Sequence, residues 1–222
     1  MSAQASTLPV PAAVPVRPDP IAVYRDDGPL ALALGRTLGP VVKLPAPLLI
    51  VLGLLPLVAA IVIGGGDVAL GVAGAVIAWV VLALGIASGT PPRPAIRWAE
   101  PPLMRATEYT ALIWIAALEG PDAYPAAFAL LAALTFRHYD LVYRLRHRGV
   151  VPARWVSRLS GGWDLRLIVA FILLAAGALP AGYFIAAGVL GVGFVSEAVY
   201  GWLAIGRVQR PLEYEDEEDE GQ

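Results

Sequence analysis

Residues 46–65, APLLIVLGLLPLVAAIVIGG, and residues 67–88, DVALGVAGAVIAWVVLALGIAS, are almost entirely apolar and follow each other directly in the chain. Each is about as long as the roughly 20 residues that a helix needs to cross the hydrocarbon core of a bilayer. The glycines at 64–66 lie between them and predict a turn. We therefore expect two adjacent membrane-spanning helices here.

The same pattern continues along the chain. Further apolar segments lie at about 103–118, 123–143, 163–179 and 181–206, separated by Gly, Pro or charged residues. The 222 residues are 58% hydrophobic and 15% charged, whereas a soluble domain has about 25% charged residues. This composition excludes an ordinary soluble domain and predicts an all-α integral membrane protein, with a six-transmembrane-helix bundle in the membrane domain 24–210.

The basic residues indicate the orientation of this bundle. All sixteen Lys and Arg residues precede the first span, follow the sixth, or lie around two alternate connections, and the other three connections contain none. Because basic residues favour the cytoplasmic side, both termini are expected in the cytoplasm and the protein in the plasma membrane. A re-entrant hairpin at 103–143 keeps this orientation, but it would bury Glu119 and Asp122 without a basic partner.

The two ends of the chain differ from the apolar bundle in composition. Residues 1–23 are rich in Pro and Ala and predict a disordered arm. Residues 211–222 belong to a predicted disordered acidic tail, and EYEDEEDE (213–220) holds seven of the eighteen acidic residues. The rest of the chain is therefore net basic.

Two short segments predict helices that lie on the membrane surface. In residues 28–39, leucine recurs at every fourth position while Arg36 and Thr37 lie off that stripe, as in an N-terminal interfacial amphipathic helix. Residues 152–160, PARWVSRLS, alternate apolar and basic side chains in a similar way.

Charged residues inside the predicted spans gather at one depth. At 1.5 Å per residue they lie roughly 18 to 30 Å from the outer surface, in the cytoplasmic third of the hydrocarbon core. A lone ionised group there costs on the order of 3 kcal/mol or more, so pairing is expected, and we predict an ion pair between Arg166 and Glu197. This charged layer consists of Arg105, Glu108, Arg137, Asp140, Arg144, Asp164, Arg166 and Glu197.

The charged layer has two interpretations, which the sequence leaves open. In the structural one, Asp140 pairs with neighbouring arginines on its own helix face. In the functional one, arginines bind an anionic headgroup, and acidic residues orient them or hold Mg²⁺. The predicted headgroup-binding residues are Arg105, Arg137, Arg144 and Arg166. The candidate catalytic residues are Glu108, His138, Asp140 and Asp164.

The residue inventory narrows the chemistry further. The chain has no Cys and two His, which excludes disulfides, thiol nucleophiles, Cys-ligated metals and multi-histidine sites. The sequence predicts no metal site, and Mg²⁺ is expected only if the protein is a transferase.

Four blocks of the sequence carry a family resemblance. They are RDDGPLALALGR (25–36), EPPLMRATEY (100–109), FRHYDLVYRLRHRG (136–149) and GGWDLRL (161–167). Over about residues 24–206 they resemble the actinobacterial membrane domain of unknown function that is fused to, or lies beside, CDP-alcohol phosphatidyltransferase domains. The resemblance implies a membrane location, an actinobacterial source, a link to phospholipid or lipid-glycan metabolism, and such a transferase as a partner.

The metal-binding motif of those transferases is absent. The segment beginning at Asp27 starts like D-G-x2-A-R, but Leu32 stands where the Arg is required and no G-x3-D-x3-D follows. Asp27 also precedes the first span, so we expect it on the membrane surface.

These observations favour a non-catalytic accessory module that binds an anionic lipid or lipid-phosphate headgroup on the cytoplasmic side. Its expected partners are the lipid bilayer and anionic lipids, and no nucleic acid is expected. The sequence does not decide whether the protein forms a homodimer. The alternatives are a divalent-metal-dependent lipid-phosphate transferase and a small transporter in which Arg166 and Glu197 form a gated pair.

Overall fold

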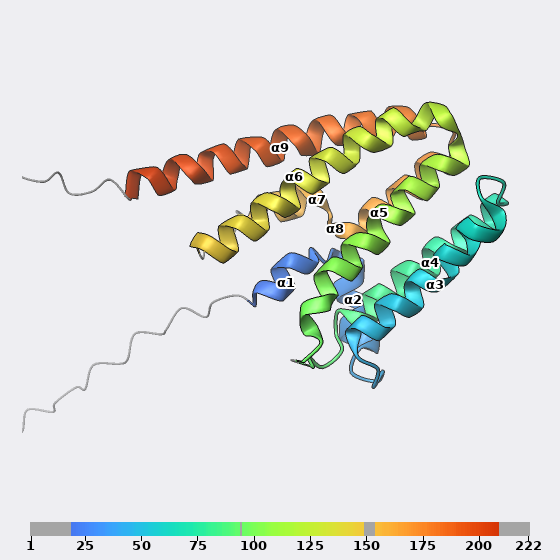
Figure 1. Ribbon diagram of the computed structural model, residues 1–222, viewed down its shortest axis with the longest axis horizontal. Helices are drawn as coiled ribbons and strands as arrows, with labels where there is room; N and C mark the ends of the chain where they lie inside the picture. Colours follow the sequence, from blue (N-terminus) through green and yellow to red (C-terminus); the bar gives the residue numbers. More distant parts are fainter. Residues whose placement is uncertain (1–18, 94, 149–153, 209–222) are drawn as a thin grey trace, which may run out of the picture.

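The computed structural model describes residues 19–93, 95–148 and 154–208, and throughout these residues the secondary structure is helical (Figure 1). The α-helices are α1 (Pro20–Arg25), α2 (Pro29–Leu38), α3 (Ala46–Gly64), α4 (Leu70–Ala87), α5 (Glu100–Glu119), α6 (Tyr124–Arg148), α7 (Arg154–Ser160), α8 (Gly162–Ala175) and α9 (Leu179–Val208). Two 3-10 helices, η1 (Arg97–Ala99) and η2 (Pro121–Ala123), precede α5 and α6.

The predicted ends of the chain fall mostly outside the described residues. The acidic tail lies outside them completely, and the N-terminal arm does so up to residue 18. Residues 20–23, which the composition assigned to the arm, instead belong to α1. Asp19 caps this helix, because its side chain accepts a hydrogen bond from the amide of Ile21 at 3.1 Å.

Six of the helices form three hairpins, α3–α4, α5–α6 and α8–α9. Figure 1 shows the three turns at one end of the molecule, and α1 with the C-terminal ends of α6 and α9 toward the other. Each turn contains a glycine with positive φ, a conformation that other residues rarely adopt: Gly65, Gly120 and Gly177. All six predicted spans are therefore confirmed as helices, with ends shifted by a few residues.

Three of these helices are long and apolar enough to cross a membrane. They are Ala46–Gly64, Leu70–Ala87 and Leu179–Leu203, with mean hydropathies of 2.8, 2.5 and 1.7. Their outer faces are strongly exposed, as at Val62 and Ile63, which a lipid environment tolerates and water does not. The described residues thus contain three candidate membrane-spanning helices.

The other predicted spans fall short of that standard for physical reasons. Helix α8 has 14 residues, which is about 21 Å of rise and less than a typical core of about 30 Å. Helices α5 and α6 are long enough, but both contain charged residues of the predicted layer. Length and hydropathy therefore support three spans and not six.

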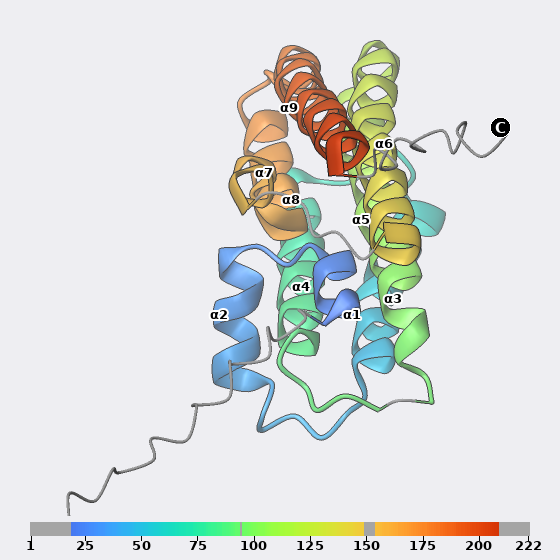
Figure 2. The same ribbon diagram turned by 90° about the vertical axis from the view of Figure 1, so that its left-hand side faces the viewer.

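Helix α2 packs closely on the C-terminal part of α4. Ala31 and Gly35 form its buried face, and Ser88 donates a hydrogen bond to the carbonyl oxygen of Ala31 at 2.9 Å. The small side chains allow this approach, since a Cβ at position 35 would lie 2.0 Å from Oγ of Ser88. The helix itself is confirmed, and Figure 2 shows it beside α4. Of the predicted leucine stripe, Leu34 packs beside Gly85 of α4 together with the small residues, whereas Leu30 and Leu38 are exposed.

Candidate functional site

Most charged residues of the predicted layer belong to two ion-pair networks. The first joins the segment Arg25–Gly28, hereafter the RDDG segment, to α5 and α8. At its centre, Nε of Arg166 donates to Glu108 at 2.7 Å and Nη2 donates to Asp26 at 2.9 Å. Nη1 donates to the carbonyl oxygen of Ser160 at 3.2 Å. Every nitrogen of this buried guanidinium therefore has a protein partner.

Two further arginines extend the first network toward α1. Arg105 donates to Glu108 and to the backbone carbonyl of Arg25. Arg25 itself donates to Asp27 at 2.9 Å and to Glu100 at 2.7 Å. Burial disfavours its charge, but the two carboxylates outweigh this effect and hold the pKa of Arg25 above its ordinary value.

Asp164 connects α8 to α2 in a different way. Its Oδ2 accepts hydrogen bonds from the amides of Leu30 and Ala31, both at 2.9 Å. Gly28, at the N-cap position of α2, offers no side chain for this purpose. Asp164 therefore caps α2 from another helix and places its charge at the positive end of the helix dipole.

The RDDG segment is largely buried inside the protein, including Asp27. The side chain of Asp27 is 8% exposed and accepts a hydrogen bond from Nε1 of Trp163 at 2.8 Å. The amide of Trp163 also donates to the carbonyl oxygen of Asp26 at 3.2 Å. The turn between α1 and α2 folds back against the start of α8, so position before the first apolar segment did not imply exposure.

The second network joins α6 to α9 through Glu197. Nη1 of Arg144 donates to Glu197 at 2.9 Å, and Nη2 contacts both Glu197 and Asp140. Arg137 lies farther away, with 3.5 Å between Nη1 and the carboxylate. Its guanidinium also lies over the ring of Phe194, 5.5 Å from the centroid. Asp140 thus pairs with Arg144 as predicted, whereas Arg137 turns to the neighbouring helix.

The predicted pair between Arg166 and Glu197 is wrong. Arg166 pairs with Glu108 and Asp26, and Glu197 pairs with Arg144 and Arg137. The two residues were matched by depth, which fixes the height of a side chain along the bundle but not the side of the helix from which it projects. Since α9 packs mainly along α6, Glu197 meets arginines of that helix.

A basic pocket of about 480 Å³ lies between α1, α5 and α6. Nε of Arg105 and Nε2 of His138 are buried and have no hydrogen-bond partner in the described part of the chain. The other imidazole nitrogen of His138, Nδ1, lies 2.6 Å from the hydroxyl of Tyr109. If that hydroxyl donates, the neutral ring carries its proton on Nε2, which is then a donor. The lining residues are Tyr24, Trp98, Pro101, Pro102, Arg105, His138, Leu141, Val142 and Arg146.

The candidate catalytic residues are not brought together. Glu108 is held by two arginines, Asp140 by Arg144, and Asp164 by backbone amides. His138 contacts Tyr109 instead of a carboxylate. Within the described ranges, no three His, Cys, Asp or Glu side chains lie close enough together to hold a metal ion.

Sequence reasoning missed the partners that complete the first network. They are Arg25, Asp26, Asp27 and Glu100, which lie outside the predicted spans. The block RDDGPLALALGR could have indicated them. It is one of the blocks that carry the family resemblance, and its charged residues had no role in the predicted layer.

The fold and the charged networks define the class of this protein. It is an all-helical protein with three helices able to cross a membrane and with buried ion pairs that join its N-terminal segment to later helices. The chain belongs to DUF5941, a family of unknown function that matches residues 19–217. Comparison with curated proteins and with solved structures gave no match.

Proposed function

We propose that this protein is a membrane-embedded accessory module that binds an anionic lipid or lipid-phosphate headgroup on the cytoplasmic side. The observation that carries the proposal is the basic pocket between α1, α5 and α6. Its described lining contains Arg105, His138 and Arg146 and no carboxylate, and two buried nitrogens there lack partners in the described residues. Phosphate oxygens accept hydrogen bonds from such donors.

The remaining lining of the basic pocket suits the end of a lipid. Tyr24 and Trp98 are side chains typical of the membrane–water interface. Pro102, Leu141 and Val142 offer apolar surface beside the basic groups. A headgroup phosphate near Arg105 would leave the glycerol and the first methylenes against this apolar wall.

The proposal changes the set of headgroup-binding residues. Arg137, Arg144 and Arg166 already have carboxylate partners, and removing those partners from buried arginines is expensive. Arg105 is also paired, with Glu108, but it differs from the other three because it lines the basic pocket and its Nε has no partner in the described residues. His138 and Arg146 line the same pocket.

Lipid retention in native mass spectrometry tests this function. Wild type purified in mild detergent should retain an anionic phospholipid, and Arg105→Ala/Arg146→Ala should lower the retained fraction at least tenfold. Because Arg105 also supports the first network, Arg146→Ala alone, at an exposed position, is the variant that cannot fail through folding. It should lower retention severalfold.

The control variant is Arg36→Ala/Arg158→Ala, which removes the same charge from two exposed positions outside the pocket. It should retain the lipid like wild type. Equal retention by all variants would refute the headgroup site, and equal loss in the control would reduce it to unspecific attraction by surface charge.

We further propose the finer membrane arrangement: six spans, both termini cytoplasmic, a plasma-membrane location, and α2 and α7 at the interface. The common end of the three hairpin turns supports it (Figure 1). The residues near these turns include acids, Asp67, Glu119 and Asp122, and no Lys or Arg, as expected for the outer side.

The link to phospholipid or lipid-glycan metabolism, an actinobacterial source and a CDP-alcohol phosphatidyltransferase partner rest on the family resemblance. Copurification of such a transferase with the tagged protein from native membranes would support the partnership. A transferase activity of this chain itself would need metal ligands brought together from Glu108, Asp140 and Asp164, which have separate partners.

A further inference from the structure

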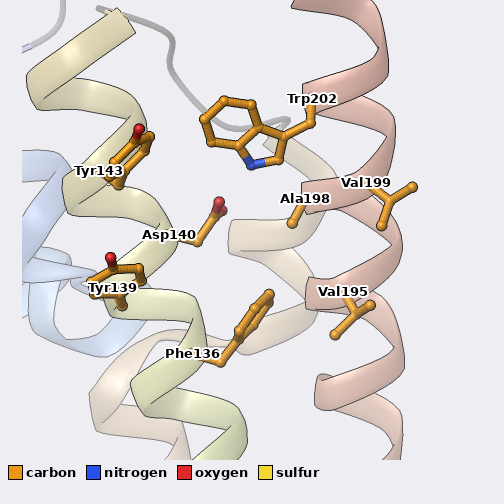
Figure 3. Close-up of a pocket in the computed structure, with 8 residues that line it drawn as sticks. All are labelled: Phe136, Tyr139, Asp140, Tyr143, Val195, Ala198, Val199 and Trp202. Carbon is orange, nitrogen blue, oxygen red and sulfur yellow. The ribbon is translucent and has the colours of Figure 1, made fainter.

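A second pocket, of about 490 Å³, lies between the C-terminal halves of α6 and α9 (Figure 3). Helix α6 contributes an aromatic and acidic wall, and α9 contributes a mainly aliphatic wall closed by an indole ring. Figure 3 shows Asp140 between the two helices, with Trp202 reaching across from α9. We call it the aromatic pocket, lined by Phe136, Tyr139, Asp140, Tyr143, Val195, Ala198, Val199 and Trp202.

The charged residues that line the aromatic pocket differ from those that line the basic pocket. Its described lining contains one carboxylate, Asp140, and no basic side chain. The arginines of the second network do not line it, because Arg144 is buried against Glu197 and Arg137 lies over Phe194. Asp140 is therefore the charged residue of this lining, and its Oδ2 is already paired with Nη2 of Arg144.

Aromatic rings from two helices line the same pocket as this carboxylate. The ring centroids of Tyr139 and Tyr143 are 6.4 Å apart, and those of Tyr143 and Trp202 are 5.4 Å apart with an interplanar angle of 47°. Tyr139 is 69% exposed, so its ring is available to a ligand. The faces of such rings carry negative potential and attract organic cations.

We infer that the aromatic pocket binds an organic ammonium group attached to an apolar chain. The rings of Tyr139, Tyr143 and Trp202 contact the ammonium group, and Val195 and Val199 contact the chain. Asp140, which stays paired with Arg144, offers the group a carboxylate oxygen. This inference is separate from the proposed headgroup function. The ligand is a cation and not an anion, and it contacts a different face of α6. The ammonium group can come from a lipid headgroup or from a soluble amphiphilic amine.

Three soluble probes with the same chain test the charge preference. Hexyltrimethylammonium, hexanol and hexyl sulfate are titrated into the full-length protein in maltoside detergent and followed by calorimetry. The cation should bind at least tenfold more tightly than the alcohol. Equal binding of cation and alcohol would show that the pocket is merely apolar and would overturn the inference.

Variants locate the binding. Tyr139→Leu and Trp202→Leu should each weaken binding of the cation at least fivefold, whereas Tyr200→Leu should not. Tyr200 is the matched control, since it is an exposed aromatic residue of α9 outside the pocket. Asp140→Asn should remove the preference over hexanol, but this residue also pairs with Arg144, so the ring variants decide.

A second experiment with lipids distinguishes a lipid headgroup from a soluble amine as the source of the ammonium group, and distinguishes the two pockets. The protein in nanodiscs of phosphatidylethanolamine and phosphatidylglycerol is released and its bound lipids are measured. Tyr139→Leu should lose phosphatidylethanolamine and keep phosphatidylglycerol. Arg146→Ala should lose phosphatidylglycerol and keep phosphatidylethanolamine. If hexyltrimethylammonium binds but the ethanolamine lipid is never retained, the ligand is a soluble amine. Ring variants that keep both ligands would refute the site.

Discussion

Asp164 combines a charge at an apolar depth with two hydrogen bonds from the amides of Leu30 and Ala31. Its predicted depth in the charged layer made it a candidate catalytic or metal-binding residue, because the sequence could not show that α2 returns to the start of α8. In the structure its role is to satisfy the first amides of another helix.

Asp164→Ala should therefore lower the free energy of unfolding by about 2 kcal/mol, because two amides lose their acceptor. Asp164→Asn keeps one oxygen acceptor and should cost less. Thermal unfolding in detergent followed by circular dichroism measures both, with Asp122→Ala at an exposed position as the control. A stable alanine variant would contradict the capping role.

Gly28 is required by the same contact. A Cβ at this position would lie 2.0 Å from Oδ1 of Asp164 and 2.2 Å from the carbonyl oxygen of Gly161. Gly28→Ala should therefore displace Asp164 and destabilise the protein by about 1–3 kcal/mol. Gly188→Ala in α9 is the matched control, since a Cβ there meets no atom within 4 Å, and it should keep or raise the unfolding temperature.

At the scale of elements, the second network holds α6 and α9 together. Arg144→Met and Glu197→Met should each cost about 3–5 kcal/mol, because each leaves buried charge without its partner. The double variant should cost less than the sum of the two by about 1.5 kcal/mol or more. Unfolding of the four proteins in one detergent measures this coupling, and strict additivity would show that the pair does not act as a unit.

Helix α2 shows what apolar periodicity can and cannot predict. The leucine stripe and the flanking Pro29 and Gly39 correctly indicated a short helix. The stripe indicated the packed face only in part: Leu34 packs on α4, but the closest approach needs small residues, which Ala31 and Gly35 supply. The exposed Leu30 and Leu38 remain free for lipid.

At the scale of the whole molecule, the apolar segments of the sequence correctly predicted where the six hairpin helices lie. The Gly and Pro residues between these segments predicted the three turns. Rotation about the helix axes was not predictable from one sequence. The prediction paired Arg166 with Glu197 because they were expected at the same depth. In the structure, the rotation of the helices brings Glu108 to Arg166 and Arg144 to Glu197. One predicted headgroup arginine, Arg105, lines the basic pocket. The sequence did not indicate that Arg146 lines it too, because that depends on where α1 lies.

The membrane arrangement can be tested directly because the chain has no native cysteine. Asp122→Cys, at the turn between α5 and α6, should react with an impermeant maleimide on intact cells. Arg36→Cys on α2 should react only after the membrane is permeabilised. Labelling is read on a gel after purification, and labelling of Arg36→Cys on intact cells would contradict cytoplasmic termini.

The contact between Asp26 and Arg166 joins positions 140 residues apart, and this separation has a consequence for biosynthesis. The RDDG segment leaves the ribosome long before α8 exists. Until then, Glu108 has Arg105 as its partner, and Asp26 lacks its guanidinium. A chain that stops early therefore keeps unpaired acidic groups beside apolar helices. The N-terminal segment is therefore held in place by this ion pair only once the chain has been synthesised through α8.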